Sequence, residues 1–239
     1  INPKKLGNRM KKHTTKKPST PAKVVLVPQT KVLTPMDFLE AGALAQKNGI
    51  PMALMKPAKN DSDIQKYVKT IPFPWAMKVA GNKIIHKTDA GGIALNIKTE
   101  KDAVNVLKKF KKIKGFEYAV VQPMQNGIEI IVGGKRDPQF GPTVLVGMGG
   151  IYTEVLKDSS VRVAPLNEKD IDDMIHELKM YPILKGVRGQ KSIAFNDLKK
   201  IMRGVSKMMV KENIAELDLN PVMASPKKVV AVDVRIIRG

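Results

Sequence analysis

The chain has 239 residues, of which 43% are hydrophobic, so it can bury a sizeable core as one large domain or two closely packed ones. It contains no cysteine, which excludes disulfides, thiolate metal sites and a cysteine nucleophile. Its three histidines, His13, His86 and His176, are widely spaced and argue against a zinc site. Any bound metal is therefore expected to be a hard cation held through oxygen atoms.

The formal net charge is +20, and residues 1–31 alone carry nine Lys or Arg and no acidic residue. Such a balance suits a polyanionic partner, a class that includes nucleic acid, nucleotides and coenzyme A. Aromatic residues make up only 5% of the chain and do not alternate with the lysines, so nucleic acid is the less favoured partner. No apolar run is long enough to span a membrane and no signal-peptide pattern is present, so we expect a cytoplasmic protein.

Low apolar content predicts that residues 1–31 form a basic tail or linker. Next, Thr34 is expected to cap a helix of about 14 residues that ends at Gly49. Strands are expected at 50–56, 75–80 and 93–97. Helices are expected at 61–70, capped by Asp61, and from Thr99 to about residue 113.

The second half is expected to begin with two strands, at 118–124 and 128–133, separated by a turn at Asn126-Gly127. Further strands are expected at 143–146 and 151–156, helices after the capping residues Asn167 and Asn196, and a final hairpin of 215–223 with 229–236. Helices and strands alternate without a regular strand–helix–strand series. The pattern therefore predicts an α+β fold rather than a doubly wound parallel sheet.

One polar segment combines a nucleophile with groups that can hold phosphate: His86-Lys87-Thr88-Asp89-Ala90-Gly91-Gly92. Imidazole is a good nucleophile at neutral pH, and an adjacent lysine, hydroxyl and glycine pair suit a phosphoryl group. The segment therefore indicates phosphoryl transfer. The alternative interpretation is a hairpin in which the glycines supply positive φ and His86 faces solvent.

Two strand segments suggest a nucleotide site. Lys78 lies between apolar neighbours, where a charge either binds an anion such as phosphate or reaches solvent from an edge strand. Around Gln122-Pro123-Met124 the proline is expected to leave backbone groups free for an adenine edge, and Glu129 could bind ribose hydroxyls. The alternative for this second segment is an ordinary edge strand interrupted by proline.

Near the carboxyl terminus, oxygen-bearing side chains alternate with apolar ones. The period of two places Glu216, Asp218 and Asn220 on one face of a strand, and hairpin pairing could bring Asp233 beside that face. A magnesium ion held by one or two such oxygens and by substrate phosphates needs little more. The alternative is a half-exposed strand with a polar outer face. Arg162, which follows Asp158-Ser159-Ser160, is a further candidate phosphate ligand.

Taken in this order, the motifs resemble the ATP-grasp domain of ADP-forming acyl-CoA synthetases of the acetyl-CoA synthetase type. The similarity extends from Thr34 to Arg238 and covers most of the chain. Its strongest segments are Met77-Lys78-Val79, Ile85-His86-Lys87-Thr88-Asp89-Ala90-Gly91-Gly92, Asp137-Pro138-Gln139-Phe140-Gly141-Pro142, Gly149-Gly150-Ile151, Arg162-Val163-Ala164-Pro165-Leu166, Tyr181-Pro182-Ile183-Leu184-Lys185-Gly186 and Leu217-Asp218-Leu219-Asn220-Pro221. The chain departs from the family pattern in its first 30 residues and at Asn82, where a proline or small residue is more usual.

The resemblance implies a role for each candidate residue. His86 matches a histidine that relays a phosphoryl group, and Lys78 matches the lysine that holds the nucleotide phosphates. The remaining matches are Gln122, Met124 and Glu129 for adenine and ribose, Asn220 and Asp233 for magnesium, and Asp218 for support of the metal or the phosphohistidine. Gly91 and Gly92 would let backbone amides approach phosphate.

The resemblance further implies an ATP-grasp fold of two α+β lobes, expected at 32–121 and 122–239, which enclose ATP or ADP with Mg²⁺. The chain would be the nucleotide-binding half of an acid–thiol ligase, incomplete without a CoA-binding α subunit or fused region, in an assembly such as α2β2. The main alternative is a non-catalytic, nucleotide-sensing ATP-grasp module of a protein acyltransferase. The sequence leaves open the acyl substrate, the choice between ADP and GDP, and the oligomeric state.

Overall fold

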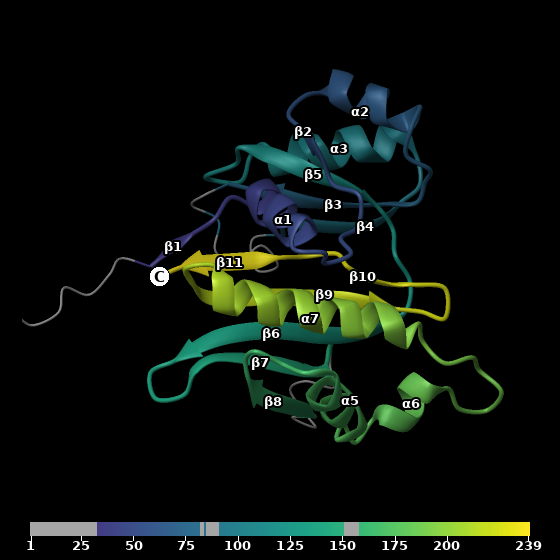
Figure 1. The fold of residues 1–239 in the computed structure, drawn as a ribbon. Coiled ribbons are helices and arrows are strands. Elements are labelled where there is room, and N and C mark those ends of the chain that lie inside the picture. The colour runs from purple at the N-terminus through teal and green to yellow at the C-terminus, as the bar shows by residue number, and fades with distance from the viewer. Residues whose placement is uncertain (1–32, 82–83, 85–90, 151–157) are drawn as a thin grey trace, which may run out of the picture. The chain divides into compact units, whose positions relative to one another are not determined.

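The computed structural model describes residues 33–81, 84, 91–150 and 158–239. The expected basic tail at 1–31, the expected strand at 151–156 and His86 all lie outside these residues. The described part of the chain forms two antiparallel sheets accompanied by helices (Figure 1). The predicted α+β class is confirmed, because no two of the named strands pair in parallel within the described residues.

The smaller sheet has four strands in the order β2-β5-β3-β4. Their bounds are β2 (Lys56–Ala58), β3 (Trp75–Ala80), β4 (Ile93–Ile97) and β5 (Tyr118–Pro123). Helices α2 (Asp61–Val68) and α3 (Glu100–Phe110) share a buried cluster with one face of this sheet, including Trp75, Met77 and Val79 of β3. All six residues of β3 are buried, which agrees with the strand expected at 75–80.

The larger sheet has seven strands in the order β1-β11-β9-β6-β7-β8, and β10 also pairs with β9. Their bounds are β1 (Thr34–Pro35), β6 (Ile128–Asp137), β7 (Gly141–Met148), β8 (Ser159–Val163), β9 (Ile214–Ala224), β10 (Val229–Ala231) and β11 (Arg235–Arg238). The helices that accompany it are α1 (Phe38–Lys47), α5 (Glu168–His176), α6 (Tyr181–Lys185) and α7 (Phe195–Lys211).

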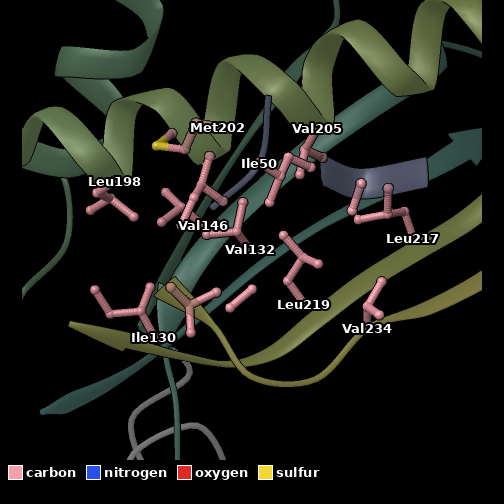
Figure 2. Packing of buried hydrophobic residues seen from close by; sticks show 14 of the residues in the cluster. Ile50, Ile130, Val132, Val146, Leu198, Met202, Val205, Leu217, Leu219 and Val234 are labelled. Carbon is pink, nitrogen blue, oxygen red and sulfur yellow. The ribbon is translucent and has the colours of Figure 1, made fainter. Parts of the chain in front are cut away.

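The long helix α7 covers one face of the larger sheet. Its side chains Leu198, Met202 and Val205 lie over Ile130 and Val132 of β6 (Figure 2). Alternation along a strand then turns Glu129 and Ile131 of β6 toward the other face, and Asp218 and Asn220 of β9 likewise. This second face carries polar groups, and it contributes one wall of the candidate site.

Several predicted boundaries are wrong. Thr34 does not cap a helix, because Thr34 and Pro35 pair with β11 as a short strand. The cap of α1 is Asp37, whose carboxylate accepts hydrogen bonds from the backbone N–H groups of Leu39 and Glu40.

Three further boundaries differ from expectation. Only the last residue of the strand expected at 50–56 lies in a strand, because β2 begins at Lys56. Helix α2 is capped by Asn60 rather than Asp61, and α7 begins at Phe195 after Ala194, without a side-chain cap from Asn196. Thr99 and Asn167 cap α3 and α5 as predicted.

The chain passes between the two sheets more than once. Strand β1 lies in the larger sheet, and helix α1 packs in the buried cluster beside that sheet. Both elements precede the smaller sheet in the sequence. The Asn126-Gly127 turn does not close a hairpin, since β5 lies in one sheet and β6 in the other. The described chain therefore starts in the larger sheet, enters the smaller one after α1 and returns after β5. No helix among the described residues is long and apolar enough to span a membrane.

Helix α7 approaches the segment after α1 so closely that a side chain is excluded at Gly204. A Cβ atom added there would lie 2.4 Å from Cγ1 of Ile50, which is itself buried. Close packing of this kind leaves no room for even one extra methyl group without displacement of the neighbour.

We expect Gly204→Ala to destabilise the fold, although alanine is the better helix former by about 1 kcal/mol. Overpacking of a buried contact opposes that gain by roughly 1–3 kcal/mol, so the melting temperature should fall by a few degrees. Thermal denaturation followed by circular dichroism measures the change. Lys207→Ala, at an exposed position of the same helix, is the control and should change little. A Gly204→Ala protein that melts higher than wild type would contradict the packing argument.

Candidate active site between the two sheets

A cleft of about 1340 Å³ is lined by residues of both sheets. Ala76, Lys78 and Gln122 line it from the smaller sheet. The larger sheet and its connections contribute Glu129, Asp218, Asn220 and Asp233. Seven of the candidate site residues named from the sequence therefore line one cavity, and the seventh is Met124, which lies after β5.

Lys78 is the buried cation of this cleft. It lies on β3, which is an internal strand, so its ammonium group does not reach solvent from a sheet edge. Its Nζ atom donates hydrogen bonds to Oδ2 of Asp233, at 2.9 Å, and to the carbonyl oxygen of Val232, at 2.8 Å. The two charged side chains are 6% and 19% exposed. A buried ammonium needs such anionic and carbonyl partners to offset its lost hydration.

Gln122 lines the cleft and has a hydrogen-bond partner within the chain. Its side-chain amide is buried and donates a hydrogen bond to the Val232 carbonyl at 3.1 Å, the same oxygen that Lys78 contacts. The Met124 amide is not free for a base either, because it donates to the carbonyl of Pro74 at 2.8 Å. Strand β5 pairs with β3 as far as Pro123, but β2 reaches only Val121, so Gln122 and Pro123 have a neighbouring strand on one side only. Gln122 holds the segment that carries Asp233.

A break in the larger sheet places Asp233 in the cleft. Strands β10 and β11 pair with successive parts of β9, and Asp233 lies in the gap between them. Opposite the gap, the pairing of β6 with β9 shifts register around Asn220-Pro221, as at a β-bulge. The amide of Val232 donates to the Pro221 carbonyl at 3.1 Å, which ties the two irregular segments together.

The oxygen-bearing residues fit a hard divalent cation. Asn220 and Asp233 supply an amide and a carboxylate from these adjoining segments, and Asp218 lines the same cleft. The described residues contain no group of three His, Cys, Asp or Glu side chains that could hold a metal ion. A magnesium ion would therefore need further oxygens from a ligand, as is usual for Mg²⁺ bound with phosphates.

The environment of Asp218 disfavours a negative charge. Burial raises the pKa of its carboxyl above the ordinary value, and the nearby carboxylates of Glu216 and Asp233 raise that pKa further. Arg235, which faces Asp218 directly in the pairing of β9 with β11, acts in the opposite direction. Arg235 also lines the cleft, and sequence reasoning missed it because its place depends on strand register.

Glu129 is held beside a glycine pair at the edge of the cleft. Its backbone carbonyl accepts a hydrogen bond from the amide of Gly149 at 2.8 Å, and a Cβ atom on Gly150 would lie 2.9 Å from its Oε2. Gly150 also has a φ of +63°, a conformation that other residues rarely adopt. The Gly149-Gly150 motif therefore makes room for the Glu129 side chain, a role that the sequence did not reveal.

A second pair of side chains links the sheets. The hydroxyl of Tyr118, on β5, donates a hydrogen bond to Oδ2 of Asp37, the cap of α1. Burial and then this bond raise the pKa of the Tyr118 hydroxyl. Neither residue was expected at the site, because the bond joins residues far apart in the sequence.

Arg162 does not reach the cleft. It lies on β8, where it forms an ion pair with Glu177 and donates hydrogen bonds to Ser160 and Val161. The expected phosphate contact would have to compete with this ion pair, and it stays a prediction. Gly91 and Gly92 are the first described residues after His86. The backbone amide of Val79 donates a hydrogen bond to the Gly92 carbonyl oxygen at 2.8 Å.

A family model described as an ATP-grasp domain matches residues 29–237. The chain belongs to the ATP-grasp family. Among its relatives is the β subunit of the ADP-forming acetate–CoA ligase I of Pyrococcus furiosus, 38% identical over 207 residues, or 83% of this chain and 89% of that subunit. The ADP-forming 4-hydroxybutyrate–CoA ligase of Nitrosopumilus maritimus is 40% identical over 190 residues, which span 75% of this chain but 27% of that protein.

A solved structure confirms the expected ATP-grasp fold. The dinucleotide-forming acetyl-coenzyme A synthetase 1 of Ca. Korarchaeum cryptofilum superimposes with a TM-score of 0.76 at 34% identity, covering 86% of this chain and 93% of that chain. That complex contains coenzyme A and Mg-AMPPCP, with a phosphohistidine segment pointing towards the nucleotide binding site. This ATP-grasp chain therefore shares its architecture with a nucleotide-binding enzyme component.

We expect Asp218→Asn to stabilise this ATP-grasp chain at pH 7. The raised pKa means that the folded state binds the Asp218 proton more tightly than the unfolded state does. The free energy of unfolding therefore falls as the pH rises from the ordinary aspartate pKa through the raised pKa. At still higher pH it stays at the lower value. The variant lacks this loss, so its melting temperature should be higher by roughly 2–4 °C, for a gain of about 1 kcal/mol.

The difference in melting temperature between Asp218→Asn and wild type should narrow as the pH falls into the range in which the wild-type carboxyl binds its proton. Glu40→Gln, at an exposed carboxylate on α1, serves as the control and should show no comparable gain. A variant that melts below wild type at pH 7 would show that Asp218 stabilises the fold as a carboxylate.

Proposed function

We propose that this chain is the nucleotide-binding half of an ADP-forming acyl-CoA ligase, as the sequence predicted. The observation that carries the proposal is the convergence of Lys78 with Asn220 and Asp233 in one cleft, from two different sheets. A lysine ammonium binds phosphate, and amide and carboxylate oxygens bind Mg²⁺. A cleft with both sets of groups suits a magnesium–nucleotide complex.

The relatives support the reaction class. They are named as ADP-forming CoA ligases, and the chain spans 89% of a β subunit but only 27% of a single-chain ligase. The remaining activities of such an enzyme would therefore lie on a partner subunit or on a further region of the same polypeptide. We propose that this partner binds coenzyme A and selects the acyl group, in a hetero-oligomer such as α2β2.

Within the cleft, the nucleotide phosphates would contact Lys78, and the metal would be held by Asn220 and Asp233. Bound Mg²⁺ would neutralise phosphate charge and so favour transfer of the phosphoryl group. Glu129, which lines the same cleft as Met124, remains the candidate for the ribose hydroxyls, since its carboxylate can accept two hydrogen bonds. The Gln122 side chain would hold Val232 and thereby Asp233 in place.

The proposed chemistry is a phosphoryl relay through His86. A ring nitrogen of His86 attacks the γ-phosphorus of ATP, the bond to the bridging oxygen breaks, and ADP leaves with that electron pair. In the next transfer a histidine of the partner takes the phosphoryl group from His86, and the synthetic direction reverses both steps. The phosphohistidine segment in the Korarchaeum complex supports a relay of this kind. In the sequence, His86 lies between Lys78, on β3, and Gly91, which precedes β4. Strands β3 and β4 pair with each other.

We expect ATP labelled in the γ-phosphate, with Mg²⁺, to label this chain on His86 as an acid-labile, base-stable adduct. His86→Asn should abolish the label because an amide nitrogen is no nucleophile, and it should leave ADP binding intact because the contacts of Lys78 and Asp233 are unchanged. His176→Asn, on helix α5, is the matched control and should keep the label.

Acid quenching and base quenching of the same reaction, followed by electrophoresis, distinguish a phosphohistidine from a phosphoester. A label that persists in His86→Asn would contradict the relay. A wild-type chain that binds Mg-ATP but takes no label in the presence of its CoA-binding partner would also contradict it.

A further inference from the structure

One concentration of positive charge plays no part in the proposed nucleotide site. Between Asp102 and Glu117 the chain carries five lysines and no acidic residue. All five are exposed, and we call them the lysine ridge: Lys108, Lys109, Lys111, Lys112 and Lys114. They lie at the end of α3 and just beyond it, on the side of the smaller sheet that is turned away from the larger sheet (Figure 1). None of the five lines the cleft.

The lysine ridge has no counter-charge within the described part of the chain. No ion pair between described residues includes any of its lysines. Elsewhere on the surface lysines do have such partners, since Lys169 pairs with Asp173 and Lys199 with Asp172. Helix α5 supplies acidic side chains for these pairs, whereas the ridge contains none. The charge of the ridge is therefore available to an external anion.

The ridge is held in place by the way the chain winds. Leu107, Phe110, Ile113 and Phe116 recur at every third position and pack in or against the buried cluster of the smaller sheet. After α3 ends at Phe110, the amides of Lys112 and Ile113 donate to carbonyl oxygens three residues earlier, at 3.1 and 2.9 Å. This tight winding turns every third residue inward and leaves the lysines between them facing solvent.

The end of the ridge is also fixed to the smaller sheet. The amide of Glu117 donates to the carbonyl oxygen of Ala80 at 3.0 Å. The carbonyl oxygen of Gly115 approaches Gly81 so closely that a Cβ atom on Gly81 would lie 2.0 Å from it. Both contacts hold the chain just beyond Lys114. The ridge is therefore an ordered surface.

Helix stability accounts for only part of this charge. Lysines in the last turn interact favourably with the negative end of the helix dipole, which applies to Lys108 and Lys109. The effect falls off beyond the last turn, where Lys112 and Lys114 lie. Lysines three or four positions apart repel each other, as at Lys108 and Lys112. The ridge therefore destabilises the folded chain slightly unless an anion binds there.

We propose that the lysine ridge binds the phosphate backbone of a nucleic-acid duplex without regard to sequence. With a rise of about 1.5–2 Å per residue, the ridge spans roughly 10 Å. A B-form duplex carries one charge per about 1.7 Å of its axis, so the same length holds about six phosphates. Five lysines in one ordered segment match this density of charge. The proposal concerns a surface outside the cleft and does not depend on the proposed function.

The composition of the ridge favours a duplex over a single strand. Proteins hold single strands by stacking bases on aromatic side chains as well as by charge. The aromatic residues beside the ridge, Phe110 and Phe116, pack in or against the buried cluster and are not exposed. A duplex backbone is bound through charge, without stacking. The low aromatic content of the chain therefore argues against single strands and not against a duplex.

The surroundings of the ridge also disfavour two other acidic partners. Protein interfaces are enriched in aromatic residues and Arg and depleted in Lys. Residues 51–123 contain fourteen lysines and no arginine. Binding in a membrane surface uses apolar side chains beside the basic ones. Within 101–117, all of which the structure describes, no large apolar side chain is exposed. A duplex backbone is the polyanion that fits this surface.

The test is fluorescence anisotropy of the full chain with a short, labelled DNA duplex of mixed sequence, at about 50 to 200 mM KCl. Glutamine has a helix propensity close to that of lysine, so the ridge variant carries Lys108→Gln, Lys109→Gln, Lys111→Gln and Lys112→Gln. The control variant loses the same charge at exposed positions outside the ridge: Lys200→Gln, Lys207→Gln, Lys227→Gln and Lys228→Gln. Both variants keep the basic residues of 1–31, so the difference between them isolates the ridge.

Wild type should bind the duplex with a dissociation constant on the order of 10⁻⁴–10⁻⁶ M, and with similar affinity for unrelated sequences. In a plot of log association constant against log salt concentration, the ridge variant should have a slope smaller in magnitude by about 3–4, because each lost phosphate contact removes about 0.9. The control variant should keep the wild-type slope to within about 1. The melting temperature of the ridge variant should not fall, because repulsion between its lysines is removed.

Three results would overturn the proposal. The first is a wild-type chain that binds no duplex at about 50 mM KCl, or a ridge variant that binds as wild type does. The second is an equal loss of affinity in the ridge and control variants, which would show a response to net charge alone. The third comes from cosedimentation with vesicles of phosphatidylserine and phosphatidylcholine. Vesicle binding that is lost in the ridge variant, without any duplex binding, would assign the ridge to a membrane surface.

Discussion

The rest of the site depends on one constraint, the need of the buried Lys78 ammonium for a partner of opposite charge. Its own sheet offers no carboxylate at that position, and the partner, Asp233, comes from the larger sheet. A charge transferred out of water without such a partner is strongly unfavourable. The pairing therefore links the chemistry of the site to the packing of the two sheets, because the contact forms only when the sheets face each other.

The inner face of the smaller sheet is built around this requirement. Lys78, Gln122 and Tyr118 each donate a hydrogen bond to the part of the chain associated with the larger sheet, while apolar residues such as Met77 and Val79 face the other way, toward α2 and α3. Ala80, Tyr118 and Val120 on the same face join the buried cluster of the larger sheet, whereas Lys78 and Gln122 line the cleft. The walls of the cleft thus carry the polar groups that a phosphorylated ligand needs.

Local pattern predicted much of this arrangement. Alternation in β9 placed Asp218 and Asn220 on one face, and the structure shows them lining one cleft. Period two is a property of the backbone, so it can be read from a single segment. The buried strand of Lys78 was also predicted from a single segment, since its six residues form one apolar run around a lysine.

Features that depend on distant partners could not be predicted. The amide of Gln122 contacts a carbonyl 110 residues away, and Arg162 pairs with Glu177 instead of entering the cleft. Thr34 carried a strong local capping pattern, yet pairing with β11 prevailed because a tertiary contact overrides local propensity. A crystal structure of the chain with Mg²⁺ and ADP tests these assignments most directly. We expect the Nζ atom of Lys78 to lie within ~3 Å of a phosphate oxygen and Asp233 to contact the metal. An intact contact between Lys78 and Asp233, with ADP bound elsewhere, would contradict them.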